Sequence, residues 1–124
     1  MARVLIVDDE EDICDYLKRI LENMGLEVAF TLLGEEALQW IEKTVWDMAI
    51  VDLKLSSSVS GLHVIKALRD KSQHTVVVAM SGYIDVGLRH EAERLGVSDF
   101  LEKPGDTGSE VFTQKIKVLL SKIA

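Results

Sequence analysis

The sequence predicts an α/β fold, a (βα)5 three-layer sandwich in which one five-stranded parallel sheet has helices on both faces. Short apolar runs such as residues 4–7 and 48–51 are rich in β-branched side chains and do not alternate with polar ones. This is typical of strands buried on both faces. The runs alternate with amphipathic segments of helical length, which indicates parallel strands joined by right-handed crossovers. The 124 residues match one ordinary domain, so we expect a single domain over residues 1–124 with no effector domain in this chain.

The first strand is expected over residues 3–7 and the first helix over about residues 10–24. Acidic side chains occupy the first turn of this helix, which is favourable beside the positive end of the helix dipole. Gly25 follows the last turn, as glycine commonly does at the carboxyl end of a helix. The helix carries one apolar stripe at helical spacing, formed by Ile13, Leu17, Ile20, Leu21 and Met24.

The other elements repeat this alternation. Gly34 opens the second helix, Gly96 ends the fourth, and the fourth strand is another fully apolar run. Apolar stripes at helical spacing support the second, third and fifth helices. The expected elements, in chain order, are strands over residues 27–31, 47–52, 75–80 and 99–101, and helices over residues 34–43, 61–70, about 85–95 and about 109–123.

The composition argues against several classes of protein. The formal net charge of −7 argues against direct binding of nucleic acid, because phosphate backbones select basic surfaces. No apolar run approaches the roughly 20 residues of a membrane-spanning helix, and the amino terminus lacks a signal-peptide pattern. The single cysteine, Cys14, rules out an internal disulfide and fits a reducing compartment. We therefore expect a cytoplasmic protein with no membrane association.

Three acidic side chains stand at the ends of two buried strands. Asp8 and Asp9 directly follow the first strand, and Asp52 ends the third. In a sheet of order 2-1-3-4-5 the strand order reverses between these two strands, where such folds bind ligands. Two carboxylates ~4 Å apart repel by about 4 kcal/mol at an effective dielectric of ~20. Taken alone, Asp8 and Asp9 are as compatible with an acidic helix cap as with a metal site. The presence of Asp52 and Lys103 at the same edge favours the metal site.

Two further strands end in polar groups at the same edge. Ser81 stands at the carboxyl end of the fourth strand, directly after residue 80, and Lys103 follows the fifth. Carboxylates without imidazole or thiolate neighbours suit Mg²⁺, and zinc is disfavoured because His63, His74 and His90 all lie away from these strand ends. Carboxylates, a hydroxyl and an ammonium around Mg²⁺ suit phosphoryl transfer through an acyl phosphate on one aspartate.

The chain resembles the receiver domain of two-component response regulators over essentially its whole length. The motifs that carry the resemblance are Val7-Asp8-Asp9-Glu10, Val51-Asp52-Leu53, Met80-Ser81-Gly82 and Lys103-Pro104. The resemblance implies that Asp52 is the phosphoacceptor. It also implies that Mg²⁺ is held by Asp8, Asp9, Asp52 and the backbone carbonyl of Lys54. Ser81 and Lys103 match the hydroxyl and the lysine of the family's motif, and Phe100 occupies the aromatic switch position.

The same resemblance implies a mechanism and partners. Asp52 accepts a phosphoryl group from a phosphohistidine of a sensor histidine kinase or a histidine phosphotransfer protein. Ser81 then moves toward the new oxygens and Phe100 fills the vacated space, which switches the surface formed by helix 4, strand 5 and helix 5. A homodimer through that surface is one form of output. Such a domain is not an enzyme beyond its self-catalysed phosphorylation and dephosphorylation.

The sequence departs from the family pattern around the phosphoacceptor. Ser56 stands where the family usually has proline, and Gly61 opens the third helix one residue later than usual. We therefore expect a longer and more mobile loop over residues 53–60. Gly105 replaces a larger side chain after Lys-Pro, and Lys54 and Tyr83 flank the site, where they could tune the lifetime of the phosphoryl group.

Two other classes of function remain open. A small Mg²⁺-dependent phosphatase with an Asp nucleophile would need two acids spaced two residues apart after the first strand, where this chain has the adjacent pair Asp8-Asp9. A phosphorylation-independent interaction module is disfavoured because the three carboxylates, the hydroxyl and the ammonium of the site are all present, as Asp8, Asp9, Asp52, Ser81 and Lys103. A flavodoxin-like binder is disfavoured because the acidic segment 8–11 would repel a cofactor phosphate.

Overall fold

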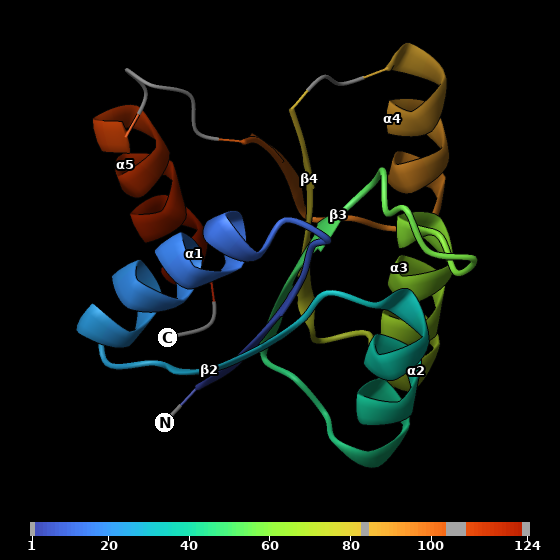
Figure 1. The fold of residues 1–124 in the computed structure, drawn as a ribbon, viewed down its shortest axis with the longest axis horizontal. Helices are drawn as coiled ribbons and strands as arrows, with labels where there is room; N and C mark the ends of the chain where they lie inside the picture. The colour runs from blue at the N-terminus through green and yellow to red at the C-terminus, as the bar shows by residue number, and fades with distance from the viewer. Residues whose placement is uncertain (1, 83–84, 104–108, 123–124) are drawn as a thin grey trace.

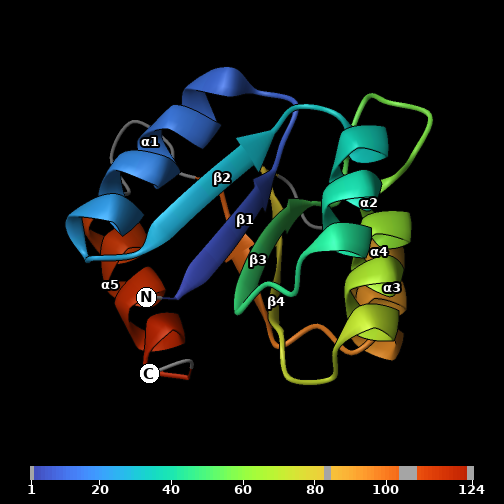
Figure 2. The same ribbon diagram turned by 90° about the horizontal axis from the view of Figure 1, so that it is seen from below.

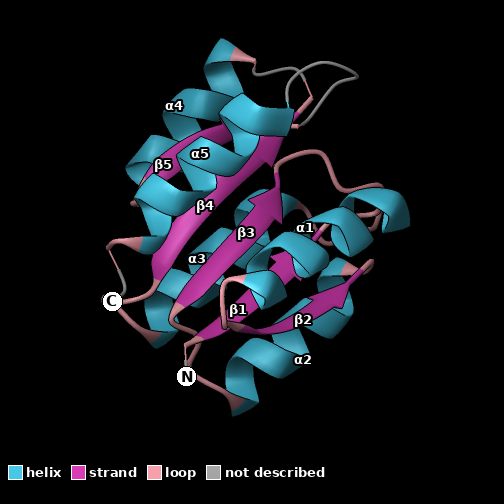
Figure 3. Cartoon of the chain, turned by 90° about the vertical axis from the view of Figure 1, so that its left-hand side faces the viewer, coloured by secondary structure: helices cyan, strands magenta, loops and turns pink. Residues whose placement is uncertain are grey.

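The computed structural model describes residues 2–82, 85–103 and 109–122. Its five strands form one parallel sheet in the order β2-β1-β3-β4-β5, and all strand arrows in Figure 3 point the same way. The predicted α/β class and strand order are therefore confirmed. The elements are β1 (Arg3–Val7), α1 (Glu11–Asn23), β2 (Glu27–Thr31), α2 (Gly34–Lys43), β3 (Met48–Asp52), α3 (Gly61–Lys71), β4 (Val76–Ser81), α4 (Val86–Arg94), β5 (Asp99–Glu102) and α5 (Ser109–Leu120).

The sheet separates two helical layers. Helices α1 and α5 cover one face, while α2, α3 and α4 cover the other (Figures 1 and 2). Alternate residues of β1 face opposite layers: Val4 and Ile6 pack with α1 and α5, whereas Leu5 and Val7 pack with α2 and α3. All four are fully buried. Burial on both faces explains why this strand is apolar without alternation.

The predicted element ends differ from the structure by a few residues. Strand β4 extends through Ser81 because Ser81 pairs with Glu102 of β5. Glycines end α1 and α4 as expected, since Gly25 and Gly96 both have a φ of 87°, a conformation in which a side chain is strained. Within the described ranges, no helix has both the length and the apolar character that a bilayer crossing requires.

Helix α3 begins against the end of β3. The Ser60 hydroxyl accepts a hydrogen bond from the His63 N–H at 3.3 Å, and the Ser60 N–H donates to His63 Nδ1 at 3.3 Å, which forms a reciprocal cap. A Cβ atom on Gly61 would overlap the carbonyl oxygen of Asp52 and lie 2.9 Å from the Leu53 Cα. Glycine at this position therefore lets the first turn of α3 approach the backbone of Asp52.

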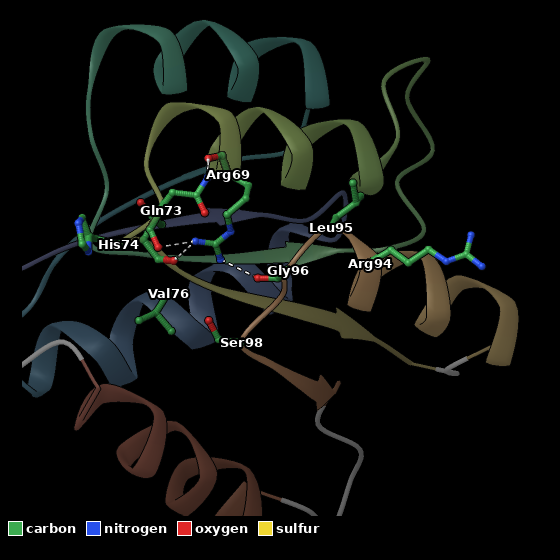
Figure 4. A pocket seen from close by; sticks show the side chains of 9 residues that line it. Arg69, Gln73, His74, Val76, Arg94, Leu95, Gly96 and Ser98 are labelled. Carbon is green, nitrogen blue, oxygen red and sulfur yellow. Dashed lines mark hydrogen bonds between the residues drawn. The ribbon is translucent and has the colours of Figure 1, made fainter.

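An open pocket lies at the opposite, amino-terminal edge of β4 and β5 (Figure 4). The Arg69 guanidinium lines it and donates hydrogen bonds to the carbonyl oxygens of Gln73, Thr75 and Gly96 at 3.0, 2.9 and 2.8 Å. These bonds join the end of α3 to the loops that precede β4 and β5. Arg69 therefore links these loops at the amino-terminal edge of the sheet.

We expect Gly61→Ala to destabilise the protein by about 1–3 kcal/mol, the usual range for overpacking a tight contact. The added methyl group collides with backbone, which cannot move aside as a flexible side chain can. Urea denaturation measures the effect. Gly82→Ala is the matched control, because in the described part of the chain its Cβ would meet only the Lys103 Cδ, at 4.0 Å. An equal loss in both variants would contradict the steric explanation.

Candidate functional site

The carboxyl edge of the sheet collects the predicted polar residues. Asp8 follows β1, Asp52 and Ser81 are the last residues of β3 and β4, and Lys103 follows β5. Strands β1 and β3 are neighbours in the sheet, so the strand order reverses between Asp8 and Asp52. The Lys103 N–H donates to the Ser81 carbonyl oxygen at 2.9 Å, which holds the ends of β4 and β5 together. The sheet itself therefore positions these groups.

The Lys103 ammonium lies among three carboxylates. Its Nζ is 3.0 Å from Asp52 Oδ2, 3.1 Å from Asp8 Oδ2 and 2.8 Å from Glu10 Oε1, and its side chain is only 11% exposed. Burial by itself would lower the pKa of Lys103, but the bonds to Glu10 and Asp52 outweigh burial and raise it. The ammonium therefore stays charged and offsets part of the repulsion between the acids.

Asp8 is the most deeply buried acid of the group, with no exposed surface. Its Oδ1 accepts a hydrogen bond from the Glu10 N–H at 2.8 Å. Its Oδ2 lies within ion-pair distance of Lys103 but has no donor in hydrogen-bonding geometry among the residues that the structure describes. Burial, with a further contribution from the Asp52 charge, raises the pKa of Asp8 to about 6. A buried carboxylate oxygen without a hydrogen bond fits a cation ligand.

Asp52 is also buried, with 2% of its surface exposed. Its Oδ1 accepts a hydrogen bond from the Lys54 N–H at 2.9 Å, and its Oδ2 faces Lys103. The Ser81 side chain is buried as well, whereas the following Gly82 is exposed. Asp52, the candidate phosphoacceptor, is therefore held at the end of β3 through both of its carboxylate oxygens.

Asp9 points to a different partner. Its Oδ2 accepts a hydrogen bond from the Ser56 hydroxyl at 2.6 Å and another from the Ser56 N–H at 3.2 Å. The Ser56 hydroxyl is the main cause that lowers the pKa of Asp9. Ligand atoms of Asp8, Asp9 and Glu10 nevertheless all lie within 4.8 Å of one another. An oxygen-only cluster of this kind suits Mg²⁺.

Two of these contacts were not predicted from the sequence. The sequence places Glu10 in an acidic first helical turn and in the first motif of the resemblance, but it does not predict that the Glu10 carboxylate is the acid closest to the Lys103 ammonium, at 2.8 Å. Ser56 was interpreted only as a departure in a longer loop, although it binds Asp9. For Glu10, the available signal was its position directly after Asp8-Asp9. No signal in the sequence pairs Ser56 with Asp9, because 46 residues lie between them.

Phe100 lies under α4. Its side chain is 7% exposed and packs in the cluster formed with α2, α3 and α4. The Arg89 guanidinium carbon is 4.5 Å from the ring centroid, a cation–π distance. Phe100 therefore adopts an inward position beneath a cation of α4. The predicted features at Tyr83, Pro104 and Gly105 lie outside the described residues.

Comparisons with known sequences agree with this geometry. A family model described as the response regulator receiver domain matches residues 4–116. The transcriptional regulatory protein FixJ of Azorhizobium caulinodans is 33% identical over 103 residues, which are 83% of this chain and 48% of FixJ. The transcriptional regulatory protein ZraR of Escherichia coli (strain K12) is 29% identical over 103 residues, 83% of this chain and 23% of ZraR. The chain thus spans half or less of each of these relatives.

Solved structures share the whole fold. The chemotaxis protein CheY4 of Vibrio cholerae superposes with a TM-score of 0.83 at 25% identity, covering 100% of this chain and 99% of CheY4. A response regulator of Burkholderia pseudomallei, solved with a phosphorylated aspartic acid, a calcium ion and citrate, superposes with a TM-score of 0.78 at 25% identity. That match covers 95% of this chain and 72% of the other.

With metal removed by EDTA, we expect Asp8→Asn to raise the free energy of unfolding, relative to wild type, by more at pH 7 than at pH 5. The pKa of Asp8 is raised from 3.8 to about 6, so its contribution to stability is present at low pH and is lost as pH rises through about 6. Asparagine does not ionise, so the variant does not lose this stability as the pH rises. Urea denaturation at both pH values measures the difference, with the exposed Asp15→Asn as control. A pH-independent difference between wild type and Asp8→Asn would contradict the assignment.

Proposed function

Because the chain belongs to the family of response regulator receiver domains, which act in signalling, we propose that it is a phosphoacceptor switch whose Asp52 is phosphorylated. The phosphoryl donor is a phosphohistidine of a cognate sensor histidine kinase or a histidine phosphotransfer protein. The observation that carries the proposal is the buried pair of Asp52 Oδ2 and Lys103 Nζ, 3.0 Å apart, beside Asp8. A buried, cation-paired carboxylate at a strand end suits a nucleophile.

The transfer exchanges one bond to phosphorus for another. A carboxylate oxygen of Asp52 forms the new O–P bond while the N–P bond of the phosphohistidine breaks and its electron pair returns to the imidazole. The product is an acyl phosphate on Asp52. The Lys103 ammonium is in position to offset the negative charge of the phosphoryl group, because it already lies 3.0 Å from Asp52 Oδ2. The exposed Gly82 leaves space on the approach.

We propose that Asp8, Asp9, Asp52 and the Lys54 carbonyl hold Mg²⁺. Within the described residues the Asp8 Oδ2 atom has no hydrogen bond, and the oxygen-only cluster of Asp8, Asp9 and Glu10 supports the two ligands that follow β1. If bound by these residues, Mg²⁺ would supply positive charge that offsets the negative charge of the carboxylates and of a phosphoryl group. The calcium ion and phosphorylated aspartic acid of the Burkholderia pseudomallei relative also support a divalent cation for this chain.

The output would pass through Ser81 and Phe100. The Ser81 side chain is buried at the end of β4, where a shift toward a phosphoryl group on Asp52 would open space toward β5. Phe100 lies on β5 under α4, and Arg89 covers its ring. A change in the position of Phe100 would therefore alter the packing of α4. We propose that this changes the surface of α4, β5 and α5, through which a homodimer or another partner reads the state.

We expect Asp52→Asn to abolish labelling by acetyl phosphate, because an amide cannot form the acyl phosphate. Intact-protein mass spectrometry detects the added phosphoryl group. Asp70→Asn is a suitable control, since Asp70 is an exposed carboxylate in an ion pair with Lys66. Labelling that persists in Asp52→Asn would show that another residue is the acceptor.

We expect Lys103→Ala to retain Mg²⁺ binding while suppressing the response of α4 to phosphorylation. The substitution removes a cation from the three acids, so it leaves their attraction for Mg²⁺ in place, but no ammonium then links the phosphoryl group to the end of β5. Calorimetric Mg²⁺ titration and amide NMR shifts of α4 measure the two effects. An α4 response equal to that of wild type would exclude this role for Lys103.

A further inference from the structure

The loop between β3 and α3 meets the acidic cluster through one residue. Ser56 donates two hydrogen bonds, from its hydroxyl and from its N–H, and both end on Asp9 Oδ2 at 2.6 and 3.2 Å. The other oxygen of Asp9, Oδ1, takes part in neither bond. These two bonds fix the orientation of Asp9 and hold its Oδ2 atom against the loop.

A second hydrogen bond fastens the same stretch of chain. The Lys54 N–H donates to Asp52 Oδ1 at 2.9 Å, so the segment from Lys54 to Ser56 is tied at one end to Asp52 and at the other to Asp9. The Lys54 carbonyl, a proposed metal ligand, lies between these two ties in the chain. These hydrogen bonds therefore connect the segment that carries the Lys54 carbonyl to two other proposed metal ligands, Asp52 and Asp9.

We propose that Ser56 is a positioning residue of the metal site, which orients Asp9 and restricts the segment that carries the Lys54 carbonyl through its two hydrogen bonds to Asp9. This inference rests on the proposed Mg²⁺ site and deepens it. Partners that orient metal ligands reduce the freedom lost on binding, and their removal commonly weakens metal affinity by about 10-fold to 100-fold. The family residue at this position, proline, has no N–H and no hydroxyl.

The rest of the loop is anchored independently of Ser56. Glu35 of α2 accepts hydrogen bonds from the Ser58 hydroxyl at 2.9 Å and from the Val59 N–H at 3.1 Å. The Ser57 hydroxyl donates to the Val59 carbonyl oxygen at 2.8 Å. Removal of the Ser56 hydroxyl therefore leaves the second half of the loop in place, and Ser56 can be tested without unfolding the loop.

The test compares Mg²⁺ affinities of the unphosphorylated protein by isothermal titration calorimetry. We expect Ser56→Ala, which keeps the N–H, to weaken binding by about 10-fold. Ser56→Thr keeps both donors and should bind as wild type does. Ser58→Ala removes a matched serine hydroxyl from the same loop and should also bind as wild type does.

A second measurement needs no metal. In EDTA the Ser56 amide should exchange slowly with solvent in the wild type and faster in Asp9→Ala, because its acceptor is lost. Equal affinities of wild type and Ser56→Ala would overturn the role of Ser56 while leaving the metal site and the phosphoacceptor in place. Equal weakening by Ser56→Ala and Ser58→Ala would also overturn it, since the effect would then be general loosening of the loop. A wild type that does not bind Mg²⁺ would overturn the proposed metal site and this inference with it.

Discussion

At the carboxyl edge of the sheet, the Lys103 ammonium lies among carboxylates that would otherwise repel one another. Asp8 and Asp52 are buried at neighbouring strand ends, and Lys103 reaches both from the far side of β4. The ammonium offsets only part of the repulsion, since the pKa of Asp8 remains raised by burial and by the Asp52 charge. Asp9 differs, because Ser56 lowers its pKa. The acids at the carboxyl edge of the sheet therefore differ in proton affinity, although they lie around the same Lys103 ammonium.

The relative positions of the site residues are fixed by paired strands more than by loops. Asp52 and Ser81 are themselves paired strand residues, and the backbone bond from Lys103 to Ser81 extends the ladder one step beyond β5. Groups carried by packed strands keep their separations better than groups on loops do. Close contact between Gly61 and the Asp52 backbone adds a steric limit from the helical layer.

The fold and the strand-end residues were predictable because both depend on local pattern. Unalternating apolar runs identify buried strands, and a strand that is identified also locates its last residue, which places Asp8, Asp52, Ser81 and Lys103 at one edge. The partners of loop side chains were not predictable. The bond between Ser56 and Asp9 and the position of Arg89 over Phe100 depend on how separate layers meet in space, which no periodicity records.

The sheet also divides the interior into two separately packed cores. Phe100 belongs to the core beneath α2, α3 and α4, while its neighbour Leu101 belongs to the core beneath α1 and α5. Because a β-strand sends adjacent side chains to opposite faces, a substitution at Phe100 acts directly on the packing of α2, α3 and α4, and acts on α5 only through the backbone of β5. The same partition allows the two cores to diverge in sequence almost independently, with compensating changes confined to one side.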